Sequence, residues 1–326
     1  MGRGDTNTSR GHPMLAFIIR RLLATIPVML VVAVFVFLML RLTPGDPAAI
    51  IAGDTATPDQ VAGIRAKLGL DEPIYTQFFI WFRKLFHGDL GESFYFKKTV
   101  IELIGDRLEP TVSLSLLTII LAVLVAVPLG VLAAKHHGSW VDRSVMGFSV
   151  LGFSVPAFVI AYALIYVFAM TFGWLPNTGY SRLGDGVGRW ASYLVMPVIT
   201  LTIIYVALIA RMTRASMLEV LSEDYVRTAR AKGQVERKVL FRHALRNAAV
   251  PIVTVIGLGV ALLIGGVVVT ENVFSIPGLG RLTVEAVLAR DFPVIQAVIL
   301  LFSLVYVLIN LGVDLLYSLL DPRIRY

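Results

Sequence analysis

The sequence lacks several features on which enzyme chemistry most often depends. It contains no cysteine among its 326 residues, which excludes disulfide bonds and thiolate chemistry. No GxxxxGK[ST] loop is present to bind ATP, and neither a GxSxG nor an HExxH motif occurs. We therefore expect no catalytic residue, no cofactor-binding residue and no metal site in this chain.

The polar residues that lie in or between apolar stretches have structural interpretations. Ser154 lies inside an apolar stretch, where a serine more often hydrogen-bonds its own helix or a neighbour than attacks a substrate. His136 and His137 follow one another in a short turn. We expect both histidines to be solvated rather than bound to a metal.

Charge is also scarce. Charged residues make up 16% of the chain and hydrophobic residues 57%, whereas soluble domains average about 25% and about 45–50%. The mean hydropathy is +0.79. The net charge of +7 comes from basic residues beside apolar runs, where Lys and Arg set membrane topology. The composition predicts a polytopic protein that contacts the lipid bilayer and no nucleic acid.

Six apolar segments approach or reach the length of about 20 residues that a membrane-spanning helix needs. They are Leu22–Leu40, Val112–Ala134, Val145–Phe172, Tyr193–Ala210, Ala248–Val269 and Val294–Val313. The predicted fold class is an all-α integral membrane protein with six transmembrane helices. The first, within residues 14–42, is too long for a signal-peptide core, so we expect it to be retained. The polar residues 1–13 are expected to form a disordered cytoplasmic tail.

The distribution of basic residues predicts the orientation. The 211–246 loop holds nine Lys and Arg residues, whereas the 173–190 and 272–292 loops hold two each. Basic loops stay in the cytoplasm, and an even number of spans places both termini on one side. We therefore expect the N-terminus and residues 321–326 to be cytoplasmic, and residues 43–107 to be extracytoplasmic.

The 43–107 segment has the pattern of a folded helical insertion. Thr57 and Gln60 form a predicted capping box, with Pro58 at the first helical position. Gly69 is expected to stop this helix. A second helix, Ile74–Phe86, carries an aromatic face that must pack either on the spans or on a partner.

Two acidic residues lie in or beside predicted spans. Asp314 falls at the end of the sixth span, where we expect a structural pairing with a basic residue. The alternative, proton coupling, lacks a second buried carboxylate. Glu271 closes the fifth span, and either interfacial anchoring or a contact with the outer loop explains it.

The densest charge in the chain follows the fourth span. Ser222 is the predicted N-cap of a helix over Glu223–Lys232, and Gly233 is its predicted left-handed C-cap. Acidic residues begin this helix and basic residues end it, which suits the helix dipole. Small residues within it suit close seating in a groove. The predicted site residues are Glu223, Asp224, Tyr225, Arg227, Thr228, Ala229, Arg230, Ala231, Lys232 and Gly233.

This loop resembles the ATPase-coupling loop of ABC importer permeases, in their peptide and nickel branch. DYVRTARAKG, followed by RHALRNAAVP, carries the resemblance. Arg227-Thr228-Ala229 stands at the position of the family's EAA, and Gly233 matches its glycine. Three further stretches resemble the same family in the same order, namely IIRRLLATIPVMLVV with LTPGDP, ENVFSIPGLGRL and DLLYSLLDPRIRY. Candidates for a gating or structural role are Glu271, Pro277, Gly278, Gly280 and Asp314.

The resemblance implies a type I ABC importer permease fold. Residues 108–320 would form the permease core, with a coupling loop at 211–247. It implies a homologous second permease as a heterodimer partner, two ATP-binding subunits that hold ATP and magnesium, and an extracytoplasmic solute-binding protein. The implied location is a bacterial inner membrane. The sequence does not identify substrate-lining residues.

The implied function is ATP-driven import of dipeptides, oligopeptides or glutathione-like peptides. Nickel or another small solute is the alternative within the family. Two other classes fit less well: an ion-coupled secondary transporter, which would need paired buried ionisable residues, and an integral membrane enzyme, which would need a polar constellation inside the bundle.

Overall fold

The computed structural model describes residues 12–42, 46–53, 56–67 and 69–320. Every regular element in this part is helical, apart from a single antiparallel bridge between Glu92 and Thr99. The elements are α1 His12–Leu42, α2 Pro47–Ala52, α3 Pro58–Lys67, α4 Ile74–Phe86, α5 Val100–Lys135, α6 Trp140–Ser154, α7 Ala157–Leu164, the π-helix η1 Ile165–Thr171, the 3₁₀ turn η2 Leu183–Asp185, α8 Val187–Leu221, α9 Asp224–Ala231, α10 Glu236–Lys238, the π-helix η3 Val239–Ala244, α11 Leu245–Asn247, α12 Ala249–Val273, α13 Leu279–Leu288 and α14 Phe292–Leu320.

The predicted tails fall largely outside these residues. Residues 1–11 and 321–326 are not described, so the expectations of a disordered N-terminal tail and a cytoplasmic C-terminal tail concern positions outside the described part. The helix α1 already includes His12 and Pro13.

Five helices are long and apolar enough to cross a bilayer, and the count reaches six if one bent pair is a single span. The five are Ile19–Met39 of α1, then α5, α8, α12 and Phe292–Tyr317 of α14. The third predicted span, Val145–Phe172, is not one continuous helix. It divides into α6 and α7–η1, which meet at 101°. Pro156 explains the break, because proline forces the residue before it, Val155, into an extended conformation.

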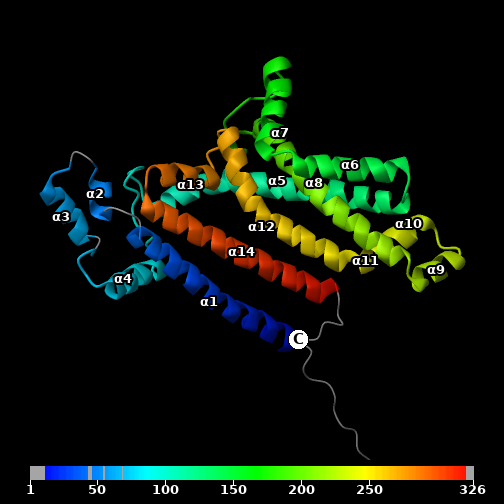
Figure 1. Cartoon of the computed structure of the whole chain (residues 1–326), viewed down its shortest axis with the longest axis horizontal. Helices are drawn as coiled ribbons and strands as arrows, with labels where there is room; N and C mark the ends of the chain where they lie inside the picture. The colour runs from blue at the N-terminus through cyan, green and yellow to red at the C-terminus, as the bar shows by residue number, and fades with distance from the viewer. Residues whose placement is uncertain (1–11, 43–45, 54–55, 68, 321–326) are drawn as a thin grey trace, which may run out of the picture.

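Three helices form the centre of the bundle. α8 packs along α5 and α12, and most of its apolar stretch is buried by neighbouring helices. Gly130 permits a close approach of α5 to α8, since a Cβ there would lie 2.5 Å from the Thr213 Cβ and 2.7 Å from the Ala210 carbonyl oxygen. α1 packs on α14 at the outside of the bundle, and the short helix α7 projects away from the long helices (Figure 1).

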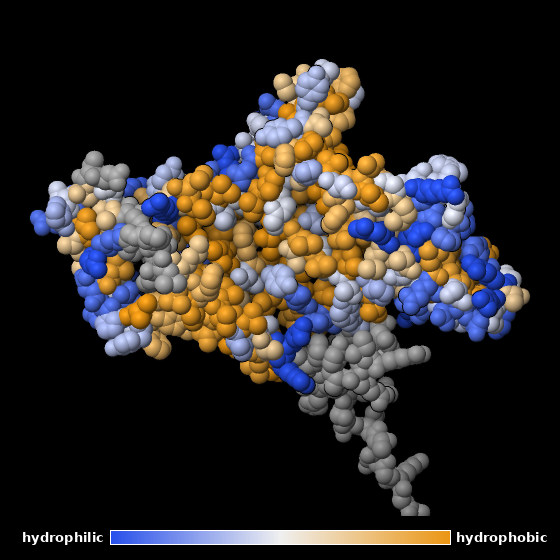
Figure 2. Space-filling model, viewed as in Figure 1, coloured by the Kyte–Doolittle hydropathy of each residue, from blue (hydrophilic) through white to orange (hydrophobic). Residues whose placement is uncertain are grey.

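The surface divides into an apolar middle and two polar ends. Figure 2 shows hydrophobic residues over the long helices, with hydrophilic residues gathered over α2–α3 at one end and α9–α10 at the other. This is the pattern expected of a protein that crosses a bilayer, because lipid-facing side chains must be apolar.

The segment between α1 and α5 forms the polar end opposite α9. The capping box at the start of α3 is confirmed: the Thr57 N–H donates to Gln60 Oε1 at 2.9 Å, and the Gln60 N–H lies 3.4 Å from Thr57 Oγ1. α4 has the predicted bounds. Its aromatic face packs on the first span, with the Phe37 ring centroid 5.1 Å from that of Phe78 and 5.6 Å from that of Trp81.

The helix of the second predicted span begins earlier than its apolar run. α5 starts at Val100, where the Thr99 hydroxyl accepts from the Glu102 N–H at 3.4 Å. The helix therefore runs through the boundary predicted between residues 107 and 108. Hydropathy alone does not mark this start, because the first turns of α5 carry charged residues.

Candidate functional site

The charged segment after α8 forms a short helix, α9, at one polar end of the molecule (Figure 1). α9 covers Asp224–Ala231, so it is shorter than the predicted Glu223–Lys232 helix. The N-cap is Glu223, with extended backbone angles φ −69° and ψ 146°. The prediction of Ser222 as N-cap is wrong: Ser222 keeps helical angles at the end of α8, and its hydroxyl donates to the Glu219 carbonyl at 2.7 Å.

The end of α9 has the predicted glycine cap. Gly233 has φ +72°. Its N–H donates to the Arg230 carbonyl at 2.9 Å, and the Gln234 N–H donates to the Ala229 carbonyl at 3.3 Å. These two bonds define a Schellman motif, which requires a left-handed residue at this position. Gly233 therefore fixes the direction in which the chain leaves α9.

One face of α9 is anchored to the rest of the protein. Val226 is fully buried, and α9 contacts η3 and the end of α8. The Tyr225 hydroxyl accepts from Asn247 Nδ2 at 2.8 Å. Arg230 pairs with Glu236 at 2.9 Å, and this hydrogen bond holds the pKa of the Glu236 carboxyl below its ordinary value, with a smaller contribution from Lys135.

The other face of α9 is open. Within the predicted site, Ala229 is half-buried, and apart from Tyr225 the exposed side chains are charged or small. The exposed residues are Glu223, Asp224, Tyr225, Arg227, Thr228, Arg230, Ala231, Lys232 and Gly233. This arrangement suits contact with a polar partner surface.

The anchored side of this end rests on a buried apolar cluster. Its members come from α5, α8, η3 and α12, with Ala248 just before α12: Val131, Ala134, Met217, Leu240, Ala244, Ala248 and Ile252. The long helices of the bundle and the segment that follows α9 therefore meet in one packed unit.

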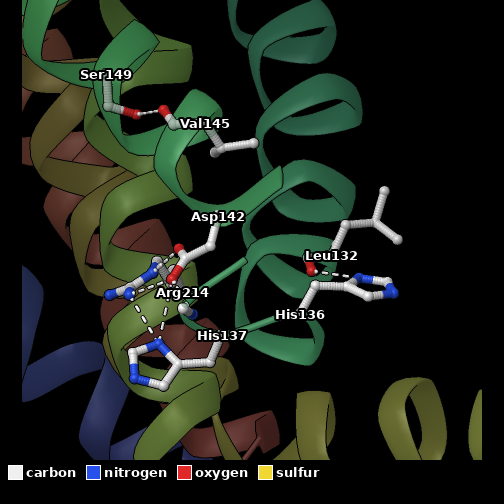
Figure 3. Close-up of polar contacts among 8 residues, drawn as sticks. Leu132, His136, His137, Asp142, Val145, Ser149 and Arg214 are labelled. Carbon is white, nitrogen blue, oxygen red and sulfur yellow. Dashed lines mark hydrogen bonds and ion pairs between the residues drawn. The ribbon is translucent and has the colours of Figure 1, made fainter. Parts of the chain in front are cut away.

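A polar network that the sequence analysis missed lies at the same end (Figure 3). Asp142, 3% exposed, accepts from both Nε and Nη2 of Arg214, with Oδ2 2.7 Å from Nη2. The Gly138 N–H donates to the same oxygen at 2.9 Å, and His137 Nδ1 lies 3.1 Å from it. His137, predicted to be solvated, is thus exposed on one side and in contact with a buried carboxylate on the other. The two charged residues are 72 positions apart, so no local signal pairs them.

Glu271 organises the opposite end of α12. It is fully buried, which contradicts the interpretation as an interfacial anchor. Its carboxylate accepts from the Thr111 hydroxyl at 2.5 Å and from the Arg281 N–H at 2.9 Å. The Thr111 oxygen in turn accepts from the Leu279 N–H at 2.8 Å. The side chains of Glu271 and Thr111 together cap the start of α13.

The residues predicted beside Glu271 build the turn around it. Pro277 is half-buried between the end of α12 and the start of α13. Gly278 and Gly280 are buried, and neither has room for a side chain. A Cβ on Gly280 would lie 2.6 Å from the Val268 Cα and 3.0 Å from Glu271 Oε2. The sequence motif thus encodes a turn wrapped closely around a carboxylate.

The remaining candidate, Asp314, has the partner that was expected. Asp314 Oδ2 lies 2.5 Å from Arg21 Nη2, which joins α14 to α1. The prediction of a structural pairing is confirmed. Ser154 also behaves as expected, since its hydroxyl donates to the Val150 carbonyl of its own helix at 2.7 Å.

Comparison with known protein families identifies the chain. Residues 126–326 match the family model described as binding-protein-dependent transport system inner membrane component. Residues 14–115 match the model for the N-terminal part of such membrane components. The chain belongs to this permease family.

Relatives of this permease have names that refer to peptide transport. A probable peptide ABC transporter permease of Sinorhizobium fredii is 56% identical over 313 residues, covering 96% of this chain and 100% of the relative. A putative peptide transport system permease of Brucella abortus is 47% identical with the same coverage. A glutathione transport system permease of Salmonella choleraesuis is 45% identical, again over 96% of this chain and all of the relative.

A solved structure shares the permease fold. A chain from inward-facing conformations of the MetNI methionine ABC transporter superposes with a TM-score of 0.56 at 18% identity, covering 68% of this chain and 97% of that one. At this identity the likeness concerns the fold alone. The fold is therefore that of an ABC importer permease, and α9 belongs to the part of the chain that the main family model matches.

Proposed function

We propose that this chain is the transmembrane permease subunit of an ATP-driven peptide importer and forms half of its translocation pathway. The observation that carries the proposal is α9. It is a short capped helix whose charged and small side chains face outward, mounted on a buried cluster that joins four segments of the bundle. A partner that moved α9 would move the bundle.

The partner at α9 is an ATPase subunit, and ATP and magnesium bind there rather than on this chain. Two such ATPases, a homologous second permease and an extracytoplasmic solute-binding protein complete the transporter. The family to which the chain belongs takes its name from dependence on a binding protein, which supports this composition.

The charge pattern supports an orientation with α9 and both termini in the cytoplasm of a bacterium with an inner membrane. The loop that contains α9 carries nine basic residues. Residues 43–107 are then extracytoplasmic, where a solute-binding protein can reach them. In this topology the bent pair α6 and α7–η1 counts as the third of six spans.

The names of the relatives favour short peptides, including glutathione, as the substrates. Nickel is the alternative within the family. Among the described residues, no group of three or more His, Cys, Asp and Glu side chains is placed to hold a metal ion, which favours a peptide over a bare cation.

An ion-coupled transporter has less support. Such a transporter needs an ionisable group that changes its protonation or ion-binding state during transport. Asp314 is the candidate, yet it lies 2.5 Å from Arg21 Nη2 and is already paired with a cation of this chain.

Reconstitution into liposomes tests the proposal. The chain, its partner permease, both ATPases and the binding protein are combined, and uptake of labelled dialanine, glutathione and Ni²⁺ is measured. We expect peptide uptake that requires ATP and every subunit. Uptake of Ni²⁺ alone would select the alternative substrate, and uptake by this chain alone under a proton gradient would refute the proposal and make Asp314 the coupling residue.

A further inference from the structure

The Asp142–Arg214 pair has a role that docking at α9 does not require. The pair lies where α8 passes the turn between α5 and α6 (Figure 3), and this turn is at the same end of the molecule as α9 (Figure 1). We infer that Asp142 and Arg214 are positioning residues that make α9, the end of α8 and the α5–α6 turn move as one body. This inference rests on the proposed function, since it concerns how a push on α9 reaches the pathway.

The geometry of the pair is specific. Both Asp142 oxygens accept from the fork of Arg214, and the Gly138 N–H donates to one of them at 2.9 Å. A guanidinium fork binds a carboxylate in one orientation, whereas a lysine would act as a point charge. Asp142 stands in the first turn of α6 and Arg214 near the end of α8. Rotation of either helix against the other would break at least one of these bonds.

A second connection joins α9 to the same turn. α9 contacts η3, and Leu240 and Ala244 of η3 pack against Val131 and Ala134 in the last turns of α5. The α5–α6 turn is therefore held from α8 through Asp142 and from the α9 segment through this apolar contact. Close packing of α5 on α8 at Gly130 stiffens the unit further.

The far end of α6 leads into a bend that would move together with this unit. α6 ends at Ser154, and the chain turns by 101° into α7–η1. With Asp142 fixed to α8, displacement of α8 carries α6 and its bend. Without the pair, α6 is held on α8 mainly by apolar packing, and part of the ATP hydrolysis is expected to occur without transport.

The test uses the complete transporter in proteoliposomes. The double variant Asp142→Asn with Arg214→Gln keeps a neutral hydrogen-bonding pair and avoids the buried unpaired charge that a single substitution leaves. We expect the complex to assemble and hydrolyse ATP, and dialanine transported per ATP to fall about fivefold or more, a typical loss of coupling between sites. Arg214→Lys keeps the charge but loses the guanidinium fork. Its dialanine transport per ATP is expected to lie between that of the unsubstituted transporter and that of the double variant.

The matched control is an exposed ion pair at the opposite end. Lys98→Gln with Asp106→Asn removes a pair at 3.1 Å and is expected to leave transport per ATP unchanged. An unchanged ratio in an assembled Asp142→Asn/Arg214→Gln complex would overturn the inference. Failure of the unsubstituted complex to show ATP-dependent uptake would instead count against the proposed function.

A distance measurement decides the question even if that variant does not assemble. The chain has no native cysteine, so spin labels at His136→Cys and Arg237→Cys report only on the turn and on the segment after α9. If these parts are one body, the label separation is the same with and without a bound ATP analogue. A nucleotide-dependent separation in the chain with Asp142 and Arg214 intact would overturn the inference.

Discussion

Asp142 and Glu271 are both buried carboxylates, but the protein satisfies them in different ways. Asp142 accepts from the side chain of Arg214 on another helix. Glu271 accepts from the backbone N–H of Arg281, ten residues further along the chain, and from the Thr111 hydroxyl. One carboxylate joins two helices through a charge pair, and the other shapes a turn through a backbone N–H and a threonine hydroxyl.

The difference indicates how each end of the molecule keeps its shape. The turn around Glu271 leaves no room for change, because Gly278 and Gly280 pack directly on the carboxylate. The α9 end is held by side-chain pairs between helices, one glycine cap and a buried apolar cluster, so it can be displaced as one body. Motion driven from α9 is therefore expected to pass along helices toward a turn that keeps its shape.

The largest effect is expected where the Glu271 turn is overfilled. Gly280→Ala places a Cβ 2.6 Å from the Val268 Cα, an atom of the backbone. Overpacking of this kind costs about 1–3 kcal/mol, and here it also displaces the carboxylate that caps α13. We expect a clear fall in the midpoint of thermal unfolding of the purified complex in detergent.

Gly265→Ala is the matched control for this prediction. Gly265 lies on the same helix as Glu271, and a Cβ there would meet no atom within 4 Å. The control is expected to leave the unfolding midpoint unchanged. Equal midpoints for Gly280→Ala and Gly265→Ala would mean that the turn can accommodate a side chain at position 280 and is not as closely packed as the structure indicates.

A smaller effect on stability, with a large effect on coupling, is expected at Gly233. Gly233→Val forces a β-branched residue to φ +72°, a conformation that costs L-residues about 1–2 kcal/mol. The Schellman bonds to Arg230 and Ala229 should be lost and the end of α9 should fray. We expect the assembled complex to hydrolyse ATP with reduced peptide transport per ATP.

Docking is checked separately in this variant. A single cysteine at Ala231→Cys, crosslinked to the ATPase, reports whether α9 still contacts its partner. Persistent crosslinking with reduced coupling supports a role of the cap in transmitting motion. Normal coupling in Gly233→Val would show that the glycine cap is dispensable.

The sequence predicted the elements that local chemistry determines. The amphipathic α4, the capping box at Thr57 and the left-handed cap at Gly233 each depend on residues within one or two turns, and each is confirmed. Ser222 was misassigned because either of two adjacent residues can cap a helix, and the backbone path out of α8 decides between them. The bend at Pro156 was not predicted, because a proline inside an apolar span is also compatible with one continuous helix in a bundle.

The buried networks depend on tertiary structure. Asp142 and Arg214 are 72 positions apart, and Thr111 and Glu271 are 160 apart. In the sequence, Glu271 at the end of an apolar run has the same pattern as an interfacial anchor. Only the packing of α13 back onto α12 removes it from solvent. Asp314 was the exception, because a lone acidic residue in an apolar run requires a basic partner wherever that partner lies.

The smallest effect is expected at the Arg230–Glu236 pair. Here the stability of the α9 end is compared at different pH values. The hydrogen bond from Arg230 lowers the pKa of Glu236. Because the folded pKa lies below the unfolded one, the pair stabilises the fold above the ordinary glutamate pKa. That stabilisation decreases as the pH falls from the unfolded value toward the lower, folded value, and it is gone below the folded value. Between pH 7 and about 5, above the ordinary glutamate pKa of about 4.3, the pair should therefore contribute a constant amount.

Both side chains are more than a third exposed, at 42% and 39%, so the contribution of the pair to the stability of the fold is below about 1 kcal/mol. We expect Glu236→Gln to speed hydrogen exchange at the backbone amides of Gly233 and Gln234 by at most about fivefold, the equivalent of that energy.

Asp224→Asn is the control, because Asp224 is 97% exposed and its pairing with Arg227 at 3.5 Å is looser. Exchange that accelerates strongly between pH 7 and 5 in the unsubstituted chain, after correction for the intrinsic rate, would contradict the lowered pKa and move the pH sensitivity of this end to another group.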